Sequence, residues 1–255
     1  MLIPDSSVVI TGGASGLGAG CVRAFTEAGA RVTLFDVDET QGRALAGETG
    51  ARFERVDVRN ETDVQRGLEA AVAAHGPPRI ILSCAGIPGG GIRVSGRAGP
   101  HPLPMLQQLF DVHVIGTFNL MRLGAAMMSS APPLEGGERG IIINTSSVVA
   151  ADGPVGMIAH SAAKAAIEAM TLPGARDLGP VGIRVNCIVV GVFDTPLTGT
   201  APPEHWQRVL ATQPFPKRMG TPAEFALLAR HLCENPMLNA ATIRLDGGLR
   251  LHVSG

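Results

Sequence analysis

The feature that most constrains the fold of this chain is a repeated alternation of short apolar runs with helix-forming segments. The runs fall at residues 7–11, 31–35, 52–56, 79–83, 140–144, 184–190 and 241–245. The helix-forming segments fall at residues 19–28, 39–49, 61–75, 106–128, 158–177, 203–211 and 221–235. Strands that alternate with helices build a doubly wound parallel sheet. We therefore predict a single α/β domain, residues 1–255, with a parallel sheet of about seven strands flanked by helices.

Composition narrows the class of protein. The chain is 45% hydrophobic, which is enough for a sizeable core, and its net charge of −1 gives no reason to expect nucleic acid or an anionic membrane as partner. The four cysteines form no CxxC pair or metal-type cluster, so we expect reduced, buried thiols and no metal. We find neither a signal peptide nor an apolar run of ~20 residues, and expect a soluble, cytoplasmic protein.

A glycine-rich loop follows the first strand. Residues Gly12 to Gly18 read GGASGLG and lead directly into a helix. Strand, glycine loop and helix together are the context that a dinucleotide-binding fingerprint requires. The glycines allow a tight turn and a close approach to a pyrophosphate, while the helix N-terminus supplies partial positive charge. The candidate cofactor-binding residues here are Gly12, Ser15, Gly16, Leu17 and Gly18.

Asp36 stands at the end of the second strand. A carboxylate at this position accepts hydrogen bonds from an adenosine ribose and repels a 2′-phosphate. No arginine or lysine lies in the glycine loop or just after Asp36, so the pattern favours NAD over NADP. The alternative is that Asp36 only caps a turn with Asp38.

Other chemically useful side chains also fall at predicted strand ends. Asp57, the segment Cys84 to Gly86, and Ser147 each follow an apolar run. Ligands of open parallel sheets bind at the carboxyl ends of the strands, near the point where the strand order reverses. These residues are therefore expected at one edge of the sheet.

The stretch from Asn144 to Lys164 concentrates candidate catalytic groups. Ser147 lies where a strand should end, and His160 and Lys164 are four residues apart, on one face of the helix that follows. Lys164 is one of only two lysines in the chain. Taken alone, the stretch is equally compatible with an ordinary strand, turn and surface helix.

The motifs occur in an order that resembles the short-chain dehydrogenase/reductase superfamily over essentially the whole chain. They read TGGASGLG (11–18), DV (57–58), CAG (84–86), GTFN (116–119), NTSS (144–147), AAK (162–164) and GIRVN (182–186). MTLPGARDL (170–178), FDTPL (193–197), QPFPKR (213–218) and IRLDGG (243–248) are most similar to the branch of short-chain 3-hydroxyacyl-CoA and hydroxysteroid dehydrogenases. The resemblance implies a Rossmann fold and NAD as cofactor.

The resemblance also implies roles for individual residues. Lys164 would hold the nicotinamide ribose, and Ser147 would hydrogen-bond the reacting oxygen. A lid at about 191–219 would cover a small-molecule substrate, and the helices at 106–128 and 158–177 would form the interface of a dimer or tetramer. The further cofactor-binding residues implied are Asp57, Val58, Cys84, Ala85, Gly86, Phe193 and Thr195.

Two positions depart from the family pattern. The catalytic tyrosine of the family is replaced by His160, and the supporting asparagine on the preceding helix is replaced by His113. The chain contains no tyrosine, so no neighbouring phenol can substitute. The cofactor half of the pattern is intact, whereas the proton-transfer half is altered.

An imidazole at position 160 changes the chemistry of proton transfer. Its ordinary pKa is near 6.5, and both Lys164 and the helix N-terminus disfavour the imidazolium form. A neutral His160 accepts a proton from an alcohol, which suits oxidation better than carbonyl reduction. Its nitrogen also lies roughly 2 Å nearer the backbone than a tyrosine hydroxyl, and misplacement by ~1 Å lowers turnover. His113 either extends a proton chain or fills a helix kink.

Two functions remain open from the sequence. The first is an NAD-dependent dehydrogenase that oxidises a secondary alcohol, such as a 3-hydroxyacyl-CoA or a hydroxysteroid, with Ser147, His160, Lys164 and His113 at the catalytic site. The second is an NAD-binding pseudoenzyme that acts as scaffold, partner subunit or sensor. Hydrolysis or elimination is disfavoured because the serine is not on a G-x-S-x-G elbow. Trp206, Phe215 and Met219 either line an apolar substrate pocket or belong to the core.

Overall fold

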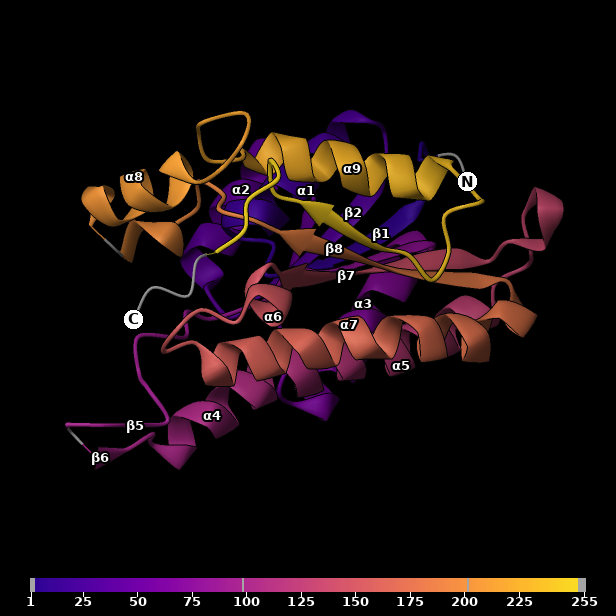
Figure 1. Ribbon diagram of the computed structural model, residues 1–255. Helices are drawn as coiled ribbons and strands as arrows, with labels where there is room; N and C mark the ends of the chain where they lie inside the picture. Colours follow the sequence, from indigo (N-terminus) through magenta and orange to yellow (C-terminus); the bar gives the residue numbers. More distant parts are fainter. Residues whose placement is uncertain (1–2, 98, 201, 252–255) are drawn as a thin grey trace.

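Seven parallel strands form one sheet in the part of the chain that the structure, a computed structural model, describes: residues 3–97, 99–200 and 202–251. The order across the sheet is β3-β2-β1-β4-β7-β8-β9, which confirms the predicted doubly wound α/β domain (Figure 1). The strands are β1 (Ser7–Thr11), β2 (Arg31–Asp36), β3 (Arg52–Arg55), β4 (Ile80–Ser83), β7 (Gly140–Ser147), β8 (Ile183–Val190) and β9 (Thr242–Leu245).

Helices cover both faces of the sheet (Figure 1). On one face lie α1 (Gly16–Glu27), α2 (Glu39–Thr49) and α9 (Pro222–Glu234), which contribute to one core cluster. On the other lie α3 (Glu61–His75), α5 (Gly116–Ser129) and α7 (Ile158–Leu178), which contribute to a second cluster. Layers on both sides are what a parallel sheet with crossover helices requires.

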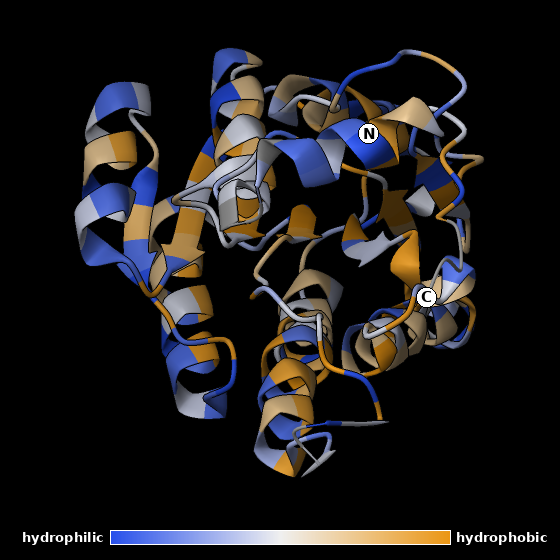
Figure 2. Ribbon diagram, turned by 60° about the vertical axis from the view of Figure 1, so that its left-hand side comes forward, coloured by the Kyte–Doolittle hydropathy of each residue, from blue (hydrophilic) through white to orange (hydrophobic). Residues whose placement is uncertain are grey.

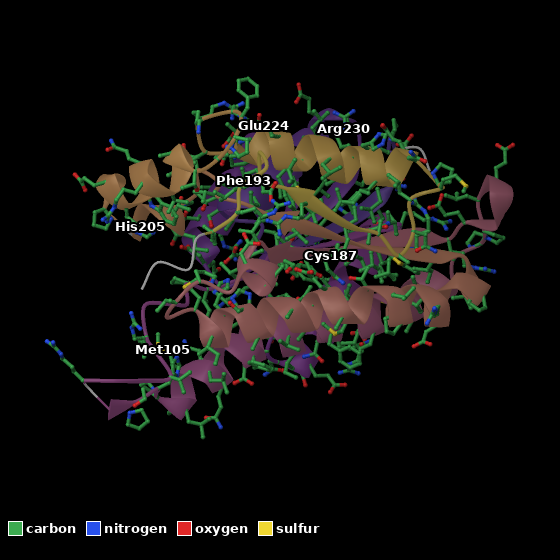
Figure 3. The ribbon with its side chains drawn as sticks, in the orientation of Figure 1. Met105, Cys187, Phe193, His205, Glu224 and Arg230 are labelled. Carbon is green, nitrogen blue, oxygen red and sulfur yellow. The ribbon has the colours of Figure 1, made fainter. Side chains whose placement is uncertain are left out.

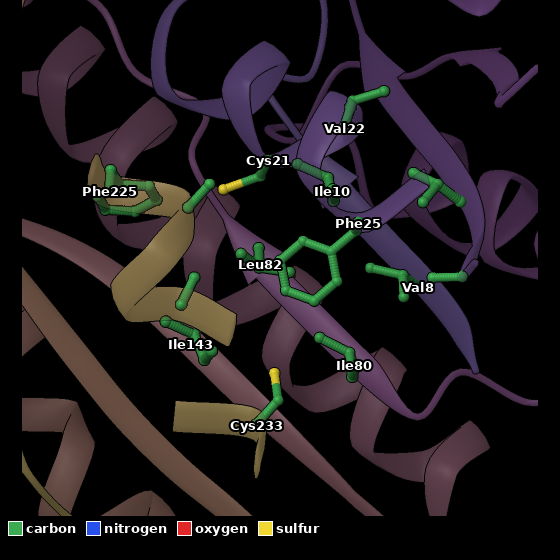
Figure 4. Close-up of a cluster of buried hydrophobic side chains, with 14 of the residues drawn as sticks. Val8, Ile10, Cys21, Val22, Phe25, Ile80, Leu82, Ile143, Phe225 and Cys233 are labelled. Carbon is green, nitrogen blue, oxygen red and sulfur yellow. The ribbon is translucent and has the colours of Figure 1, made fainter. Parts of the chain in front are cut away.

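The strands are apolar in continuous runs because both faces are buried. In β1, Val8 and Ile10 pack into the cluster with α1 and α9, while Val9 packs into the cluster with α3 and α5. Figure 4 shows Phe25 of α1 among Val8, Ile80 and Leu82. Coloured by hydropathy, the strands are mostly apolar, and the helices beside them carry apolar residues on one side and polar residues on the other (Figure 2).

The strand order reverses between β1 and β4. The chain moves outward from β1 to β2 and β3, then returns so that β4 pairs with β1 on its other side. Loops that leave β1 and β4 therefore diverge at the carboxyl edge, which is where open parallel sheets bind ligands.

The predicted single helix at 106–128 is divided into three segments. These are α4 (Leu103–Leu109), a π-helical turn (Phe110–Ile115) and α5, and His113 lies in the π turn. A π turn places one extra residue in the helix and changes the direction in which the following side chains point. The prediction was wrong here because apolar periodicity does not distinguish α from π hydrogen bonding.

Other boundaries also differ from the predictions. β7 runs three residues beyond the predicted end, to Ser147, because it pairs with β8 along its whole length. The segment predicted as a loop at 87–104 carries a small hairpin, β5 (Ser95–Gly96) with β6 (Gly99–Pro100), and the first turn of α4. The described structure also contains four short helices: η2 (Glu135–Gly137), α6 (Val149–Asp152), η3 (Gly179–Val181) and η4 (Thr198–Thr200).

The segment predicted as a lid, about 191–219, contains η4 and α8 (Pro203–Ala211); its residue 201 lies outside the described residues. Trp206 and Met219 pack against a third apolar cluster, and the indole N–H of Trp206 donates to the Thr198 carbonyl at 2.8 Å. Phe215 is 81% exposed. Trp206 and Met219 thus lie half-buried against the core, as the core alternative expects, whereas Phe215 is exposed.

Leu82 tests the central packing of the sheet. It is fully buried in β4, so Leu82→Ala should lower the free energy of unfolding by about 2–5 kcal/mol through lost contacts and a residual cavity. Leu227→Ala is the matched control, since Leu227 is 68% exposed. Urea unfolding followed by circular dichroism measures both variants; equal stability losses would contradict this packing.

Candidate active site

The glycine loop is held close to the segment that follows β4. Gly12 and Gly16 have φ values of +62° and +51°, which disfavour other residues. A Cβ at Gly12 would lie 2.7 Å from Ala85 Cα, and one at Gly16 would lie 3.3 Å from Thr195 Cβ. α1 begins at Gly16, and the Ser15 side chain makes no capping bond in the described structure. The first amide groups of α1 therefore face the loop with their partial positive charge.

Asp36 connects the end of β2 to this loop. One carboxylate oxygen accepts a hydrogen bond from Ala14 N at 3.0 Å, and the other accepts one from Asp38 N at 3.0 Å. The turn-capping contact predicted as an alternative is therefore present, together with a contact to the glycine loop. The carboxylate lies where it can meet a ligand that rests on that loop.

Asp57 and Val58 form the next part of the edge. Arg59 pairs with both oxygens of Asp57, and this hydrogen bonding lowers the pKa of the carboxyl group. Val58 is fixed by α5: its carbonyl accepts from Asn119 Nδ2 at 3.2 Å, and its side chain packs where Gly116 has no Cβ. Sequence reasoning missed this role of Asn119, although its motif GTFN had been singled out.

The segment Cys84 to Gly86 continues from β4 across the top of β1. Cys84 N donates to the Thr11 carbonyl at 3.2 Å, and the Thr145 hydroxyl lies 3.8 Å from the Cys84 sulfur.

Two predicted cofactor residues occur after β8. Thr195 lies against the glycine loop at Gly16. Phe193, labelled below α9 in Figure 3, is 5% exposed. Its ring makes an edge contact with that of Phe225, centroid to centroid 6.5 Å, so the ring belongs to the core.

Lys164 is buried between α7 and the sheet. Its ammonium donates to the Thr145 carbonyl at 3.0 Å, and burial lowers the pKa of the side chain to about 8. The nearby Cys187 and Cys84 thiols act in the opposite direction. The alternative of an ordinary surface helix is excluded, because His160 and Lys164 are 7% and 8% exposed.

One turn further along α7, Glu168 accepts a hydrogen bond from the Ser146 hydroxyl at 2.7 Å. This contact ties α7 to β7 below Lys164. The sequence gave no signal for it, since a serine and a glutamate 22 positions apart have no fixed spacing.

His160 and His113 lie beside each other. Their ring centroids are 5.2 Å apart and the rings are inclined by 60°. Burial, and then the charge of Lys164, lowers the pKa of His160 to about 4. Burial, Lys164 and His160 lower the pKa of His113 to about 2. Both imidazoles are therefore neutral at ordinary pH, which agrees in direction with the expectation for His160.

Ser147 is the last residue of β7 and is half-buried. Its hydroxyl oxygen accepts from Val149 N at 3.4 Å, at the start of α6. The described contacts join His160 to His113 but do not join Ser147 to either histidine.

Two cavities begin at this edge or beside it. One of about 630 Å³ runs from the glycine loop, Asp194 and Pro196 along α1 as far as Glu27, between α1 and α9. Another of about 480 Å³ lies between residues 92–95 and the turn 153–156, with Ile158 and Ser161 from the first turn of α7. The second cavity is adjacent to His160 in sequence and has a largely apolar lining.

The described residues contain no group of three or more His, Cys, Asp or Glu side chains that could hold a metal ion. Within the same residues, none of the helices combines the length and the hydrophobicity that a membrane crossing demands.

Comparison with known proteins identifies the protein family to which this fold, with its glycine loop at the carboxyl edge of the sheet, belongs. A family model described as Enoyl-(Acyl carrier protein) reductase matches residues 12–250. The chain belongs to the short-chain dehydrogenase/reductase family, and it is an oxidoreductase.

Individual relatives are similar over almost the whole chain. The human 3-hydroxyacyl-CoA dehydrogenase type-2 is 45% identical over 247 residues, covering 95% of this chain and 94% of the relative. The protein of that name from Drosophila melanogaster is 39% identical over 253 residues, covering 98% and 99%. The crystal structure of 3-hydroxyacyl-CoA dehydrogenase type-2 from Mycobacterium avium superposes with a TM-score of 0.94 at 37% identity, covering 98% of this chain and 97% of that one.

The histidine pair makes stability depend on pH. The folded-state pKa values of His113 and His160 lie below the ordinary 6.5, so the unfolded chain binds more protons as pH falls below 6.5. Stability is thus lost on acidification. For His113 the loss between pH 7 and pH 5 should be about 2 kcal/mol. Urea unfolding of the natural protein and of His113→Leu at both pH values measures it; the same pH dependence in both proteins would refute the assignment.

Proposed function

We propose that this protein is an NAD-dependent dehydrogenase that oxidises a secondary alcohol, with His160 as the general base. The observation that carries the proposal is the burial of neutral His160 and cationic Lys164 on one face of α7. Helix α7 packs against the sheet, and β1 of the same sheet leads into the glycine loop. The relatives named 3-hydroxyacyl-CoA dehydrogenase support a 3-hydroxyacyl-CoA as substrate, and a hydroxysteroid is a second member of the same chemical class.

The residues at the carboxyl edge fit a dinucleotide. The positive φ values of Gly12 and Gly16 and the open amide groups at the start of α1 suit a pyrophosphate. Asp36 would bind the adenosine ribose, and Asp57 with Val58 would border the adenine. Cys84, Ala85, Gly86, Phe193 and Thr195 would line the nicotinamide half. When bound, NAD supplies the hydride acceptor.

The remaining chemistry belongs to the side chains of this chain. Lys164 keeps its proton at neutral pH, since its pKa is about 8, and would hold the nicotinamide ribose. Ser147 would donate a hydrogen bond to the substrate oxygen. His160 would accept the hydroxyl proton, because an imidazole with a pKa of about 4 is unprotonated at neutral pH.

The cavity beside α7 supports a substrate with a long apolar part. Val94, Val155 and Ile158 are exposed on its walls. An acyl chain or a steroid would cover these side chains, and its binding would orient the alcohol towards His160.

We further propose a homo-oligomer, a dimer or tetramer, in the cytoplasm. Four apolar side chains on neighbouring helical segments are 45–61% exposed: Leu103 of α4, Ile115 of the π turn, Phe118 of α5 and Leu172 of α7. Apolar side chains on adjacent helices suit contact with a second copy.

The pH dependence of turnover tests His160. With the pKa of His160 at about 4 and that of Lys164 at about 8, kcat/KM for NADH production should be flat between about pH 5.5 and 7.5 and fall above about pH 8. His160→Ala should lower kcat about 10²–10⁴-fold with little change in NADH affinity. A panel of 3-hydroxyacyl-CoAs and secondary alcohols supplies the substrates.

His160→Tyr separates the two functions that the sequence left open. Turnover by the natural protein, lost in His160→Ala, supports a histidine base. Turnover by the tyrosine variant alone would replace the proposal with a cofactor-binding protein that lacks its acid/base group.

Asp36→Ala tests the cofactor assignment. Loss of a charged hydrogen bond to the ribose should weaken NAD binding about 10-fold or more and reduce the preference over NADP. Asp38→Ala is the matched control, because Asp38 is a half-buried carboxylate two residues away that caps α2. Titration of both variants with NADH and NADPH gives the dissociation constants; unchanged NADH affinity in Asp36→Ala would sink the ribose role.

A further inference from the structure

The contact between His113 and His160 brings together two buried rings, each with a ring nitrogen that lacks a hydrogen-bond partner among the described residues. The two rings come from different elements, the π turn and α7, and meet at 5.2 Å between centroids. They are 1% and 7% exposed. The Nδ1 atom of each ring is buried and has no hydrogen-bond partner among the described residues. Buried polar atoms without partners are rare in folded proteins, so two of them on rings in contact require an explanation.

The tautomer of His113 follows from its other nitrogen. Nε2 lies 3.0 Å from the Ile87 carbonyl oxygen, which only accepts hydrogen bonds. The shorter contact favours a proton on Nε2 over the alternative, in which the Ile87 amide, at 3.4 Å, donates to an unprotonated Nε2. Because burial keeps this imidazole neutral, Nδ1 carries no proton and is a buried acceptor.

His160 then has two possible tautomers of unequal cost. With its proton on Nε2, both Nδ1 atoms would be buried and unprotonated on rings in contact, and neither would have a donor among the described residues. With its proton on Nδ1, the donor that His113 lacks is supplied by His160. An unsatisfied buried acceptor costs about 1–3 kcal/mol, which favours the second arrangement.

The segment after β4 is shaped to admit both rings. A Cβ at Gly86 would lie 2.7 Å from Cε1 of His113, and a Cβ at Gly89 would lie 3.0 Å from Nδ1 of His160. Glycine at these two positions leaves room for imidazoles on the same stretch of backbone that supplies the Ile87 carbonyl. The two rings and this segment thus form one unit.

We propose that His113 is a positioning residue that holds His160 as the Nδ1–H tautomer, through a direct hydrogen bond between the Nδ1 atoms or through one water. Nε2 of His160 then keeps its lone pair for the substrate hydroxyl. The consequence for catalysis rests on the proposed function, whereas the tautomer itself does not.

The arrangement also stabilises the protonated base. When the substrate O–H bond breaks and an Nε2–H bond forms, His160 becomes an imidazolium whose Nδ1–H already points at an acceptor. A charged donor makes a stronger hydrogen bond than a neutral one. This offsets part of the repulsion from the Lys164 ammonium, the charged group that lowers the pKa of both rings.

Nuclear magnetic resonance of the protein labelled with ¹⁵N-histidine reads the tautomers without a substrate. In the natural protein at pH 7, His160 should show a protonated Nδ1 and an unprotonated Nε2, and His113 should show the reverse. Loss of signals in His160→Gln and His113→Gln assigns the two residues. His231→Gln, at an exposed position in α9, is the control for unrelated changes.

Two substitutions of His113 separate positioning from simple support. Asparagine keeps a hydrogen-bonding group near the position of Nδ1, and glutamine keeps one near the position of Nε2, where it can still contact Ile87. If His113 positions His160, His113→Asn retains the Nδ1–H tautomer and most of the turnover. His113→Gln should lose the tautomer and lower kcat on the order of 10-fold or more, with little change in KM.

The outcomes are distinct. A protonated Nε2 on His160 in the natural protein overturns the proposal, as does a His113→Gln variant that keeps the Nδ1–H tautomer. If no alcohol is oxidised but the Nδ1–H tautomer is present and depends on His113, the proposed function fails while the positioning role stands.

Discussion

The parallel pairing of β7 with β4 on one side and β8 on the other is the constraint on which the site depends. It carries β7 unbroken to Ser147, at the carboxyl edge of the sheet. It also presents the Thr145 carbonyl to the ammonium of Lys164 and the Ser146 hydroxyl to Glu168. Helix α7 is thereby fixed against the sheet at two successive turns, and the position of His160 follows from it.

Burial sets the electrostatics of this region. Burial of the two imidazoles, and then the charge of the Lys164 ammonium that donates to the Thr145 carbonyl, lowers the pKa of both histidines and holds them neutral. Burial also brings the pKa of Lys164 itself down to about 8. An imidazole starts from an ordinary pKa near 6.5, and the pKa of His160 is driven lower, to about 4. A neutral His160 therefore suits accepting a proton better than donating one.

The sequence predicted the parts of the site that lie on a regular element or in a short motif. His160 and Lys164 share a face because a helix repeats every 3.6 residues, and Gly12 to Gly18 form a turn because glycine tolerates positive φ. It did not predict the π turn that carries His113 beside His160, since apolar periodicity does not distinguish α from π hydrogen bonding. Nor did it predict the carbonyls of Ile87 and Thr145 as partners, because every residue has a carbonyl and no pattern marks the one that is used.

By itself, then, the sequence determined the layered architecture and showed which reactive side chains follow which strands along the chain. These features depend on periodicity and on local backbone preferences. Only the tertiary structure decided which distant residues meet: the ring of His113 beside that of His160, Asp36 on the glycine loop, Asn119 on Val58 and Glu168 on Ser146. Those contacts join residues that are 22 to 61 positions apart. Their geometry depends on how helices settle on the sheet, which packing fixes and local sequence does not.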